Sequence, residues 1–336
     1  RREIIQNNLD VMTISGNGAS PKILMRPDVR NSDIIIAVTD SDEINMTVCM
    51  AAKAAGIKQT IARIRSSDYV GEEAAEFHKI LGIDLIINPE YVTALEISKI
   101  LLVPAALDVE DFASGRIRLL EVRIVPDSAL ANIPINELNF GPNVLIVGIL
   151  RMGKMIIPYG RDKLMPYDNV FFIGDSNSLA EIGNNFKETL SPVKKVMIIG
   201  AGRIGRNLAT ILEQKGISVK VIEKKPERCQ DLAKILKKGS VYCGEGTDIE
   251  LLTEEGVGEA DAVICLTDDD KLNLLLALLA KDLGAQKTIA RVGRTEYIPL
   301  MEKVGVDVVL SPRLLTASVI LSHIKKDKFV AVSLLE

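Results

Sequence analysis

The chain has 336 residues, of which 47% are hydrophobic and 4% aromatic, and it contains no tryptophan. A formal net charge of −4 with interspersed signs provides no basic face, so we expect no nucleic-acid partner. This length predicts two or three domains, each able to bury its own core. Val/Ile/Leu runs alternate with glycine-punctuated helical stretches, which predicts an α/β class with parallel sheets covered on both faces.

The first third of the chain is expected to contribute parallel strands joined by helices. The pattern predicts strands over residues 10–14, 33–38, 59–63 and 85–87, and helices over 72–81 and 93–102. The last helix ends ahead of Pro104, as suits a crossover linker.

A middle segment, residues 115–175, has a different texture. Strand-like alternations at 117–124, 144–150, 154–157 and 170–173 are separated by Pro and Gly turns, with a short helix near 135–138. This pattern predicts a small α+β domain of antiparallel character.

A dinucleotide-binding pattern runs over residues 195–223. An apolar strand leads into a Gly-x-Gly-x-x-Gly turn, a helix and a second strand that ends on Glu223. The glycines allow a tight turn, close approach of backbone N–H groups to a pyrophosphate, and close packing of helix on strand. A carboxylate at Glu223 would accept the ribose hydroxyls and repel a 2′-phosphate, which favours NAD or an adenosine nucleotide over NADP. The loop residues are Gly200, Ala201, Gly202, Arg203, Ile204 and Gly205.

Further strands are predicted along the rest of the chain. They cover residues 219–222, 240–242, 262–266, 288–292 and 308–310, and an apolar strand at 329–335 closes the chain. That last strand follows its nucleotide domain as residues 117–124 follow the first.

An internal repeat relates the first and last thirds. Residues 37–45 align with 265–273 at an offset of 228, as do 61–64 with 289–292; residues 82–84 align with 305–307 at an offset of 223. At the first offset Arg1 matches Cys229, so the first copy has no counterpart of residues 195–223. We expect either that the sequence is a fragment at its N-terminus or that it leaves out the segment equivalent to residues 195–223. The alternative is that another chain supplies the central strand.

The repeat also marks candidate ligand contacts at the carboxyl edge of each sheet. These are Thr39 and Asp40 in the first copy, Thr267 and Asp268 in the second, and Thr247 with Asp248 after the preceding strand. Asp268 is equally expected to cap the helix starting near Lys271, and Thr247 and Asp248 alternatively make only a turn.

Arginines complete the candidate site. Arg203 can reach a phosphate with its guanidinium, and Arg291, matched by Arg63, points to the same edge, with a buried ion pair as the alternative role. Lys224 and Lys225 are expected to be solvated, and His78 and His323 to be surface or interface residues.

No residue pattern predicts catalysis or metal binding. Neither a Ser/His/Asp constellation, a P-loop lysine nor metal-ligand spacing occurs, so we expect a binding protein, with an NAD-dependent oxidoreductase of unidentified substrate as the alternative. Four cysteines without a CxxC pair are expected to be reduced and packed, in a cytosolic setting. Apolar runs are too short to span a bilayer, and no signal peptide is recognised.

The motifs Gly-Ala-Gly-Arg-Ile-Gly, Leu-Thr-Asp-Asp-Asp, Ile-Ala-Arg-Val and Arg-Ile-Arg-Leu-Leu-Glu-Val, in this tandem order, resemble the TrkA family. Its members are peripheral subunits of bacterial and archaeal Trk potassium uptake systems, built from tandem RCK (KTN) domains. The resemblance implies a cytoplasmic, non-enzymatic regulator on the inner face of the plasma membrane. It implies a homotetramer ring that gates a Trk-type membrane potassium transporter in response to NAD or NADH and to ATP or ADP.

The resemblance implies four segments. A first Rossmann-like domain lacking its N-terminal strand and glycine loop covers 1–106, a small TrkA-C-like domain 107–190, a second Rossmann-like domain 191–324, and the start of a truncated small domain 325–336. The implied nucleotide contacts are Gly200 to Ile204, Glu223, Thr267, Asp268 and Arg291, with Thr39, Asp40 and Arg63 as counterparts.

Overall fold

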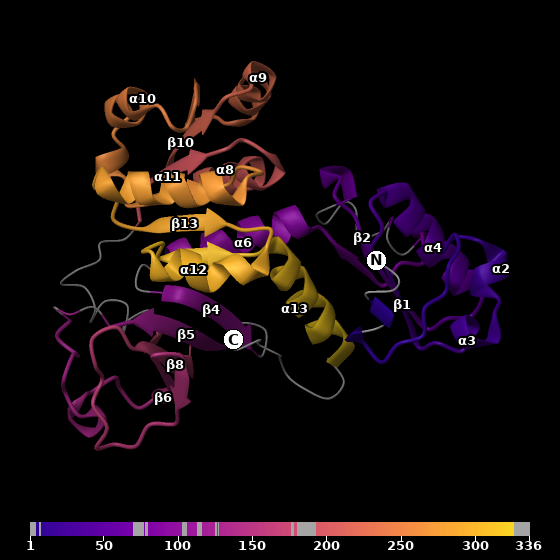
Figure 1. Ribbon diagram of the computed structural model, residues 1–336, viewed down its shortest axis with the longest axis horizontal. Coiled ribbons are helices and arrows are strands. Elements are labelled where there is room, and N and C mark those ends of the chain that lie inside the picture. The colour runs from indigo at the N-terminus through magenta and orange to yellow at the C-terminus, as the bar shows by residue number, and fades with distance from the viewer. Residues whose placement is uncertain are drawn as a thin grey trace. The chain divides into compact units, whose positions relative to one another are not determined.

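A computed structural model describes residues 5–6, 8–69, 77, 80–102, 106–112, 116–124, 126, 128–175, 178–179 and 193–325 (Figure 1). It divides into two compact units, Arg1–Pro89 and Glu90–Glu336. The predicted α/β class with parallel nucleotide-domain sheets is confirmed.

The first unit contains a three-stranded parallel sheet of order β1-β2-β3. Its core gathers Cys49, Ala62 and Ile64, all fully buried, between the long helix and the sheet. Ser41 begins that helix by accepting a hydrogen bond from the Ile44 N–H, a typical N-cap. The elements are α2 (Pro21–Leu24), α3 (Pro27–Arg30), β1 (Ile34–Ala37), α4 (Asp42–Ala54), β2 (Gln59–Arg63), η1 (Ser67–Tyr69) and β3 (Leu85–Ile87).

The strand predicted at residues 10–14 is wrong, because that segment has no strand pairing in the structure. Its repeat counterpart, β11 (Ser240–Cys243), pairs only with β10 (Ser218–Glu223). The first copy has no segment matching β10, so the hydrogen-bonding partner that would make residues 10–14 a strand is missing from the described sheet.

The second nucleotide domain is built on a six-stranded parallel sheet of order β11-β10-β9-β12-β13-β14. The order reverses between β9 and β12, which is the topological switch point where ligands of open α/β sheets bind. The remaining strands are β9 (Lys195–Ile199), β12 (Ala262–Cys265), β13 (Thr288–Arg291) and β14 (Val308–Leu310).

Helices cover both faces of this sheet. One face buries Leu208, Leu212 and Leu232 from α8 (Arg203–Gln214) and α9 (Pro226–Ile235). The other buries Leu252 and Leu276 from α10 (Ile249–Glu254) and α11 (Asp270–Asp282), together with α12 (Ile298–Lys303). Two 3-10 turns, η3 (Val257–Glu259) and η4 (Thr295–Tyr297), and helix α13 (Pro312–Lys325) complete the domain.

Helix α6 (Pro89–Leu102) packs in the core of the second nucleotide domain. Ala94, Ile97, Ile100 and Leu101 are at most 1% exposed and cluster with β9, α8 and β10. The sequence placed this helix in a first domain spanning 1–106, whereas the compact unit containing it begins at Glu90.

The small domain is a five-stranded antiparallel sheet of order β4-β5-β8-β6-β7, so its predicted antiparallel character is confirmed. Its core includes Phe172, Leu120 and Ile149. The predicted short helix is a 3-10 turn, and the first strand was not predicted. The elements are β4 (Ala106–Phe112), β5 (Ile117–Arg123), η2 (Ile135–Glu137), β6 (Val144–Arg151), β7 (Lys154–Ile156) and β8 (Asn169–Asp175).

Three predictions fall on residues that the structure leaves undescribed. They are most of the helix at 72–81 with His78, the strand at 329–335, and the segment 325–336 beyond its first residue. The four domain ranges stay predictions.

Candidate nucleotide-binding site

The glycine loop connects β9 to α8, and its three glycines are needed for different reasons. Gly200 adopts φ +108°, and a Cβ there would lie 3.1 Å from the backbone of Leu266, so the predicted tight turn is confirmed. A Cβ on Gly205 would overlap the Gly200 carbonyl oxygen, so helix α8 approaches the turn only because no side chain intervenes. Gly202 has an ordinary φ of −63° and faces open space, since no atom lies within 4 Å of where its Cβ would stand.

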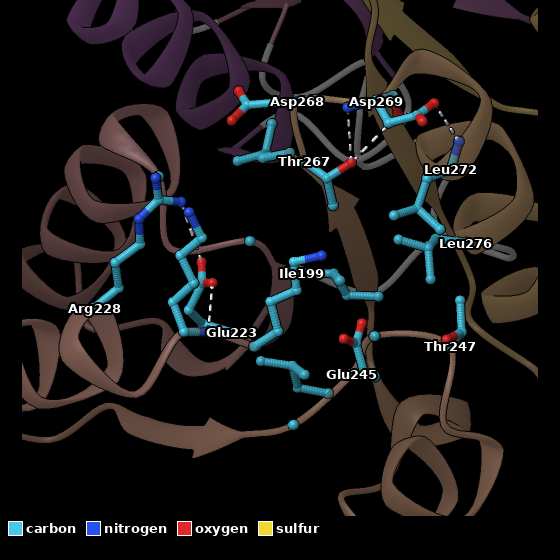
Figure 2. A pocket seen from close by; sticks show the side chains of 18 residues that line it. Ile199, Glu223, Arg228, Glu245, Thr247, Thr267, Asp268, Asp269, Leu272 and Leu276 are labelled. Carbon is cyan, nitrogen blue, oxygen red and sulfur yellow. Dashed lines mark hydrogen bonds and ion pairs between the residues drawn. The ribbon is translucent and has the colours of Figure 1, made fainter.

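A cavity of about 420 Å³ opens at the carboxyl edge of the sheet over this loop (Figure 2). That volume suits a mononucleotide or part of a dinucleotide. Its lining combines buried apolar side chains with charged side chains, of which Glu223 is buried and Asp268 exposed. Its lining residues are Ile199, Gly200, Gly202, Ile222, Glu223, Lys224, Lys225, Arg228, Gly244, Glu245, Gly246, Thr247, Leu266, Thr267, Asp268, Asp269, Leu272 and Leu276.

Glu223 lies at one end of the cavity and is only 5% exposed. One carboxylate oxygen accepts a hydrogen bond of 2.8 Å from the Ala201 N–H, and the other accepts one of 2.9 Å from the Lys225 N–H. The Arg228 guanidinium lies 3.7 Å away, and Figure 2 shows it directed at this carboxylate. Glu223 therefore ties the end of β10 to the glycine loop and presents fixed acceptors to the cavity.

The opposite end is held by a buried amide, Asn273. Its side-chain oxygen accepts from both the N–H and the hydroxyl of Thr267, at 2.9 and 2.7 Å. Its amide nitrogen donates to the carbonyl oxygens of Thr267 and Arg291. The amide thus clamps the turn after β12 to the end of β13.

Asp268 does not cap α11, so that alternative is wrong. Asp269 is the N-cap and accepts from the N–H groups of Lys271 and Leu272, while the Asp268 side chain is 93% exposed at the cavity rim. The cap therefore lies one residue further along the chain than Asp268.

Arg291 donates a 2.7 Å hydrogen bond to the Thr267 carbonyl oxygen and lies 3.9 Å from the Asp268 carboxylate. The first copy repeats this geometry: Arg63 donates to the Thr39 carbonyl oxygen at 2.8 Å and lies 3.4 Å from Asp40. With side-chain exposures of 22% and 20%, the arginines orient the turns from below and do not form a fully buried ion pair.

Arg203 is not among the residues that line the cavity. Its guanidinium is 63% exposed and lies 3.8 Å from the carboxylate of Glu90, in the first turn of α6. The ion pair joins the glycine loop to the helix that enters from the first third of the chain.

The turn after β11 places one of its two predicted residues in the cavity. Thr247 is part of the lining, whereas Asp248 is the N-cap of α10 and accepts from the Glu250 and Leu251 N–H groups. Lys224 and Lys225 are exposed, as predicted, and also lie on the cavity rim.

Of the predicted residues, Gly200, Gly202, Glu223, Thr247, Thr267 and Asp268 line the cavity. Ala201, Arg203, Ile204, Gly205, Asp248 and Arg291 support it without lining it, and Thr39, Asp40 and Arg63 form the equivalent turn of the first unit.

Sequence reasoning missed Asn273 and its counterpart Asn45, which makes the same four contacts in the first unit. The signal was available, because the offset of 228 aligns both asparagines. It missed Asp42 and Asp270 in the same way; Asp270 accepts from the N–H groups of Gly293 and Arg294. Arg228 carried no such signal.

Within the described ranges, no group of three or more His, Cys, Asp and Glu residues is arranged to hold a metal ion. No helix among those residues is long and apolar enough to cross a membrane.

Comparison with known families assigns most of the chain. The TrkA-N domain matches residues 1–89 and 196–312, and the TrkA-C domain matches 119–187. A Trk system potassium uptake protein trkA homolog 1 of Methanosarcina mazei is 37% identical over 323 residues, covering 94% of this chain and 79% of the relative. The Trk system potassium uptake protein TrkA of Vibrio alginolyticus is 32% identical over 334 residues, covering 98% and 73%.

Solved structures share the fold. The GsuK RCK domain superposes with a TM-score of 0.69 at 19% identity, covering 97% of this chain and 70% of that one. The GsuK channel bound to NAD superposes with a TM-score of 0.70 at 19% identity, covering 97% and 58%. At this identity the likeness establishes an RCK-type architecture.

Proposed function

The chain belongs to the TrkA family, and from this premise we propose that it is a nucleotide-binding regulatory subunit of a Trk-type potassium uptake system. The observation that carries the proposal is the cavity over the glycine loop. Glu223 presents fixed acceptors at its ribose end, and the start of α8 faces its centre. Such a site recognises an adenosine ribose and a pyrophosphate.

NAD or NADH and ATP or ADP are the proposed ligands. The ribose hydroxyls donate to Glu223, and the phosphates lie over Gly200 and Gly202, where backbone N–H groups can approach them. Thr247, Thr267 and Asp268 line the remainder. A relative of the fold, the GsuK channel, has been solved with NAD and, at a TM-score of 0.55, with ADP, which supports both ligand types.

Arg203 provides a route from ligand to domain arrangement. Its ion pair with Glu90 is long, at 3.8 Å, and its guanidinium is 63% exposed, so the pair is worth about 0–1 kcal/mol, whereas a phosphate offers a charged bidentate acceptor. Phosphate binding therefore competes with Glu90 for the guanidinium and changes the contacts of the first turn of α6, while the buried face of the helix stays in the core. A ligand shifts such an equilibrium only by its differential affinity for the two states.

We propose that the site binds nucleotide without reacting with it, and that binding acts by changing the conformation of the protein. We place the protein at the cytoplasmic face of the plasma membrane, as a homo-oligomer, with a tetramer ring as the expected form. Its partner is the integral-membrane subunit, and nucleotide occupancy sets the potassium flux through that subunit.

Calorimetric titration with NAD, NADH, ATP and ADP tests the site. We expect wild type to bind at least one of them, and Arg203→Ala to lose more affinity for ATP than for ADP. The Arg206→Ala variant removes the same charge one turn along α8, outside the cavity lining, and is expected to match wild type. Equal losses for all four ligands in Arg203→Ala would contradict its role.

Potassium flux through a Trk-type membrane subunit in proteoliposomes tests the output. We expect the purified protein to change the flux in a nucleotide-dependent way. A flux that is indifferent to nucleotide, at concentrations that saturate the cavity, would refute regulation while leaving nucleotide binding intact.

A further inference from the structure

Two of the four cysteines lie against Glu223 from different directions. Cys229, in α9, donates a hydrogen bond from its Sγ to the Glu223 carbonyl oxygen at 3.1 Å. Cys243 ends β11, and the strand register makes it the direct neighbour of Glu223 on β10. Both cysteines therefore flank Glu223, the residue at the ribose end of the cavity, although neither is itself a lining residue.

The two thiols also contact each other. Burial, and after it the hydrogen bond with the Cys243 thiol, raises the pKa of Cys229 to about 12. Cys229 is 8% exposed, whereas Cys243 is exposed. A dissolved reagent thus reaches Cys243 first, and the buried Cys229 is placed to react only with its neighbour.

Neither sulfur is needed to satisfy the backbone. The Glu223 carbonyl oxygen also accepts a 3.0 Å hydrogen bond from the Gly244 N–H, so it keeps a partner if the Cys229 proton is lost. Cys243 is an exposed side chain that contributes nothing to the buried core. This corrects the expectation that all four thiols are packed.

The pair is confined to the second copy. At the repeat offset of 228, Cys229 corresponds to Arg1 and Cys243 to Ser15. Serine is close to cysteine in size and shape, so the strand end tolerates a residue that cannot be oxidised. The two cysteines occur together only where the glycine loop and Glu223 are present in the chain.

We propose that Cys229 and Cys243 form a reversible disulfide that closes the ribose end of the cavity and lowers its affinity for nucleotide. The assignment of the ligand rests on the proposed function; the disulfide itself does not. Disulfides in reducing compartments are usually transient, and serve catalysis or redox sensing.

The oxidant is a low-molecular-weight disulfide. The Cys243 thiolate attacks one of its sulfur atoms, giving a mixed disulfide and releasing one small thiolate. The Cys229 thiol then loses its proton to water and attacks the Cys243 Sγ, which expels the second small thiolate. Two protein thiols are oxidised by two electrons, one small disulfide is reduced to two thiols, and excess small thiol reverses both steps.

The bond acts on the cavity through the loop that follows Cys243. Gly244, Glu245 and Gly246 all line the cavity. Gly246 packs so closely on Ile199 that a Cβ there would overlap its side chain, so a shift at the start of this loop moves the loop into the space that the ligand occupies. Joining Cys243 to α9 fixes the start of the loop beside Glu223. Occupancy and disulfide then exclude each other, and bound nucleotide protects both thiols.

Thiol counting after equilibration with glutathione and glutathione disulfide tests the site. We expect wild type to lose two of its four thiols, with a Cys229–Cys243 peptide found by mass spectrometry, and dithiothreitol to restore them. Cys243→Ser should keep its three remaining thiols, and Cys229→Ser should retain a glutathione adduct on Cys243. A wild type that keeps four free thiols, or one that pairs other cysteines, overturns the site.

Nucleotide titration of the same samples tests the consequence. Oxidised wild type should bind at least tenfold more weakly than reduced wild type, and Cys243→Ser should be insensitive to the glutathione ratio. Unchanged affinity in the oxidised protein overturns the control of the cavity. Failure of the reduced protein to bind any nucleotide would instead refute the proposed function, because the thiol count is read without ligand.

Discussion

Exchanging single glycines for alanine in the loop after β9 should separate folding from ligand binding. In Gly205→Ala the new Cβ meets the backbone carbonyl oxygen of Gly200, which cannot rotate away, so the helix or the turn must shift. In Gly202→Ala the Cβ enters open space with ordinary φ. The two variants change the same number of atoms within one turn of chain.

The magnitudes follow from these contacts. Overpacking costs about 1–3 kcal/mol, and more where backbone is the obstacle. Alanine recovers about 1 kcal/mol of helix propensity inside α8. We therefore expect Gly205→Ala to destabilise the second nucleotide domain by about 2 kcal/mol. Gly202→Ala should leave stability within about 0.5 kcal/mol of wild type while weakening nucleotide binding at least tenfold, because its methyl group stands where a pyrophosphate approaches.

Native-state hydrogen exchange, read by mass spectrometry on peptides covering residues 195–214, measures the first effect locally in this multidomain chain. Calorimetry with NADH and ATP measures the second. Equal protection in Gly205→Ala and wild type would refute the packing argument. Unchanged affinity in a folded Gly202→Ala would refute the placement of phosphates over the loop.

Three further perturbations address Glu223, the clamping asparagines Asn273 and Asn45, and Glu213, whose carboxylate accepts from the N–H groups of residues 237–239. Glu223→Gln should raise the Kd for NADH about tenfold or more and reduce discrimination against NADPH in titrations, since a charged acceptor is lost; unchanged discrimination would contradict its ribose role. Asn273→Ala should destabilise its domain by about 2–4 kcal/mol in urea unfolding, because Thr267 N–H and a neighbouring carbonyl lose partners, and Asn45→Ala should do so only for the first unit. Hydrogen bonds from the backbone N–H groups of residues 237–239 lower the pKa of Glu213 in the folded protein. The stabilisation of the fold by this carboxylate is therefore complete above the pKa of Glu213 in the unfolded chain and is lost as the pH falls through its folded pKa. Protection factors of these amides should fall on acidification, and a Glu213→Gln variant with the same pH profile would exclude this cause.

The strands of the second nucleotide domain were predictable from sequence because each is a short apolar run bounded by turn residues. The observed strand Val308–Leu310 coincides with prediction, and the others differ by one residue at one end or, for Ser218–Glu223, at both ends. Strand β4 was missed because acidic residues interrupt its apolar pattern, and only its pairing with β5 makes it a strand.

The site was predictable where local geometry dictates a residue type, as at Gly200. Contacts between distant segments were not predictable. The apolar sequence of α6 indicates burial but names no partner, and the ion pair of Glu90 with Arg203 joins residues more than a hundred positions apart. The repeat aligns Asn273 with Asn45, so both residues could have been noticed. An asparagine side chain can bond many different groups, however, and the sequence does not show which backbone groups lie around it.

The burial of α6 determines how this chain can be divided in the laboratory. Ile97, Ile100 and Leu101 are at most 1% exposed, and burying each side chain is worth about 1.5–3 kcal/mol. Their sum, about 5–9 kcal/mol, is comparable with the whole stability of a typical domain. A protein expressed from residue 191 onward would lack α6, so the second nucleotide domain would expose the apolar surface that α6 covers, and we expect it to aggregate. A soluble version of this domain must include residues 89–102, either fused to it or added as a peptide. Helix α6 is therefore a structural part of the second nucleotide domain, although the sequence-based boundaries assign it to the first.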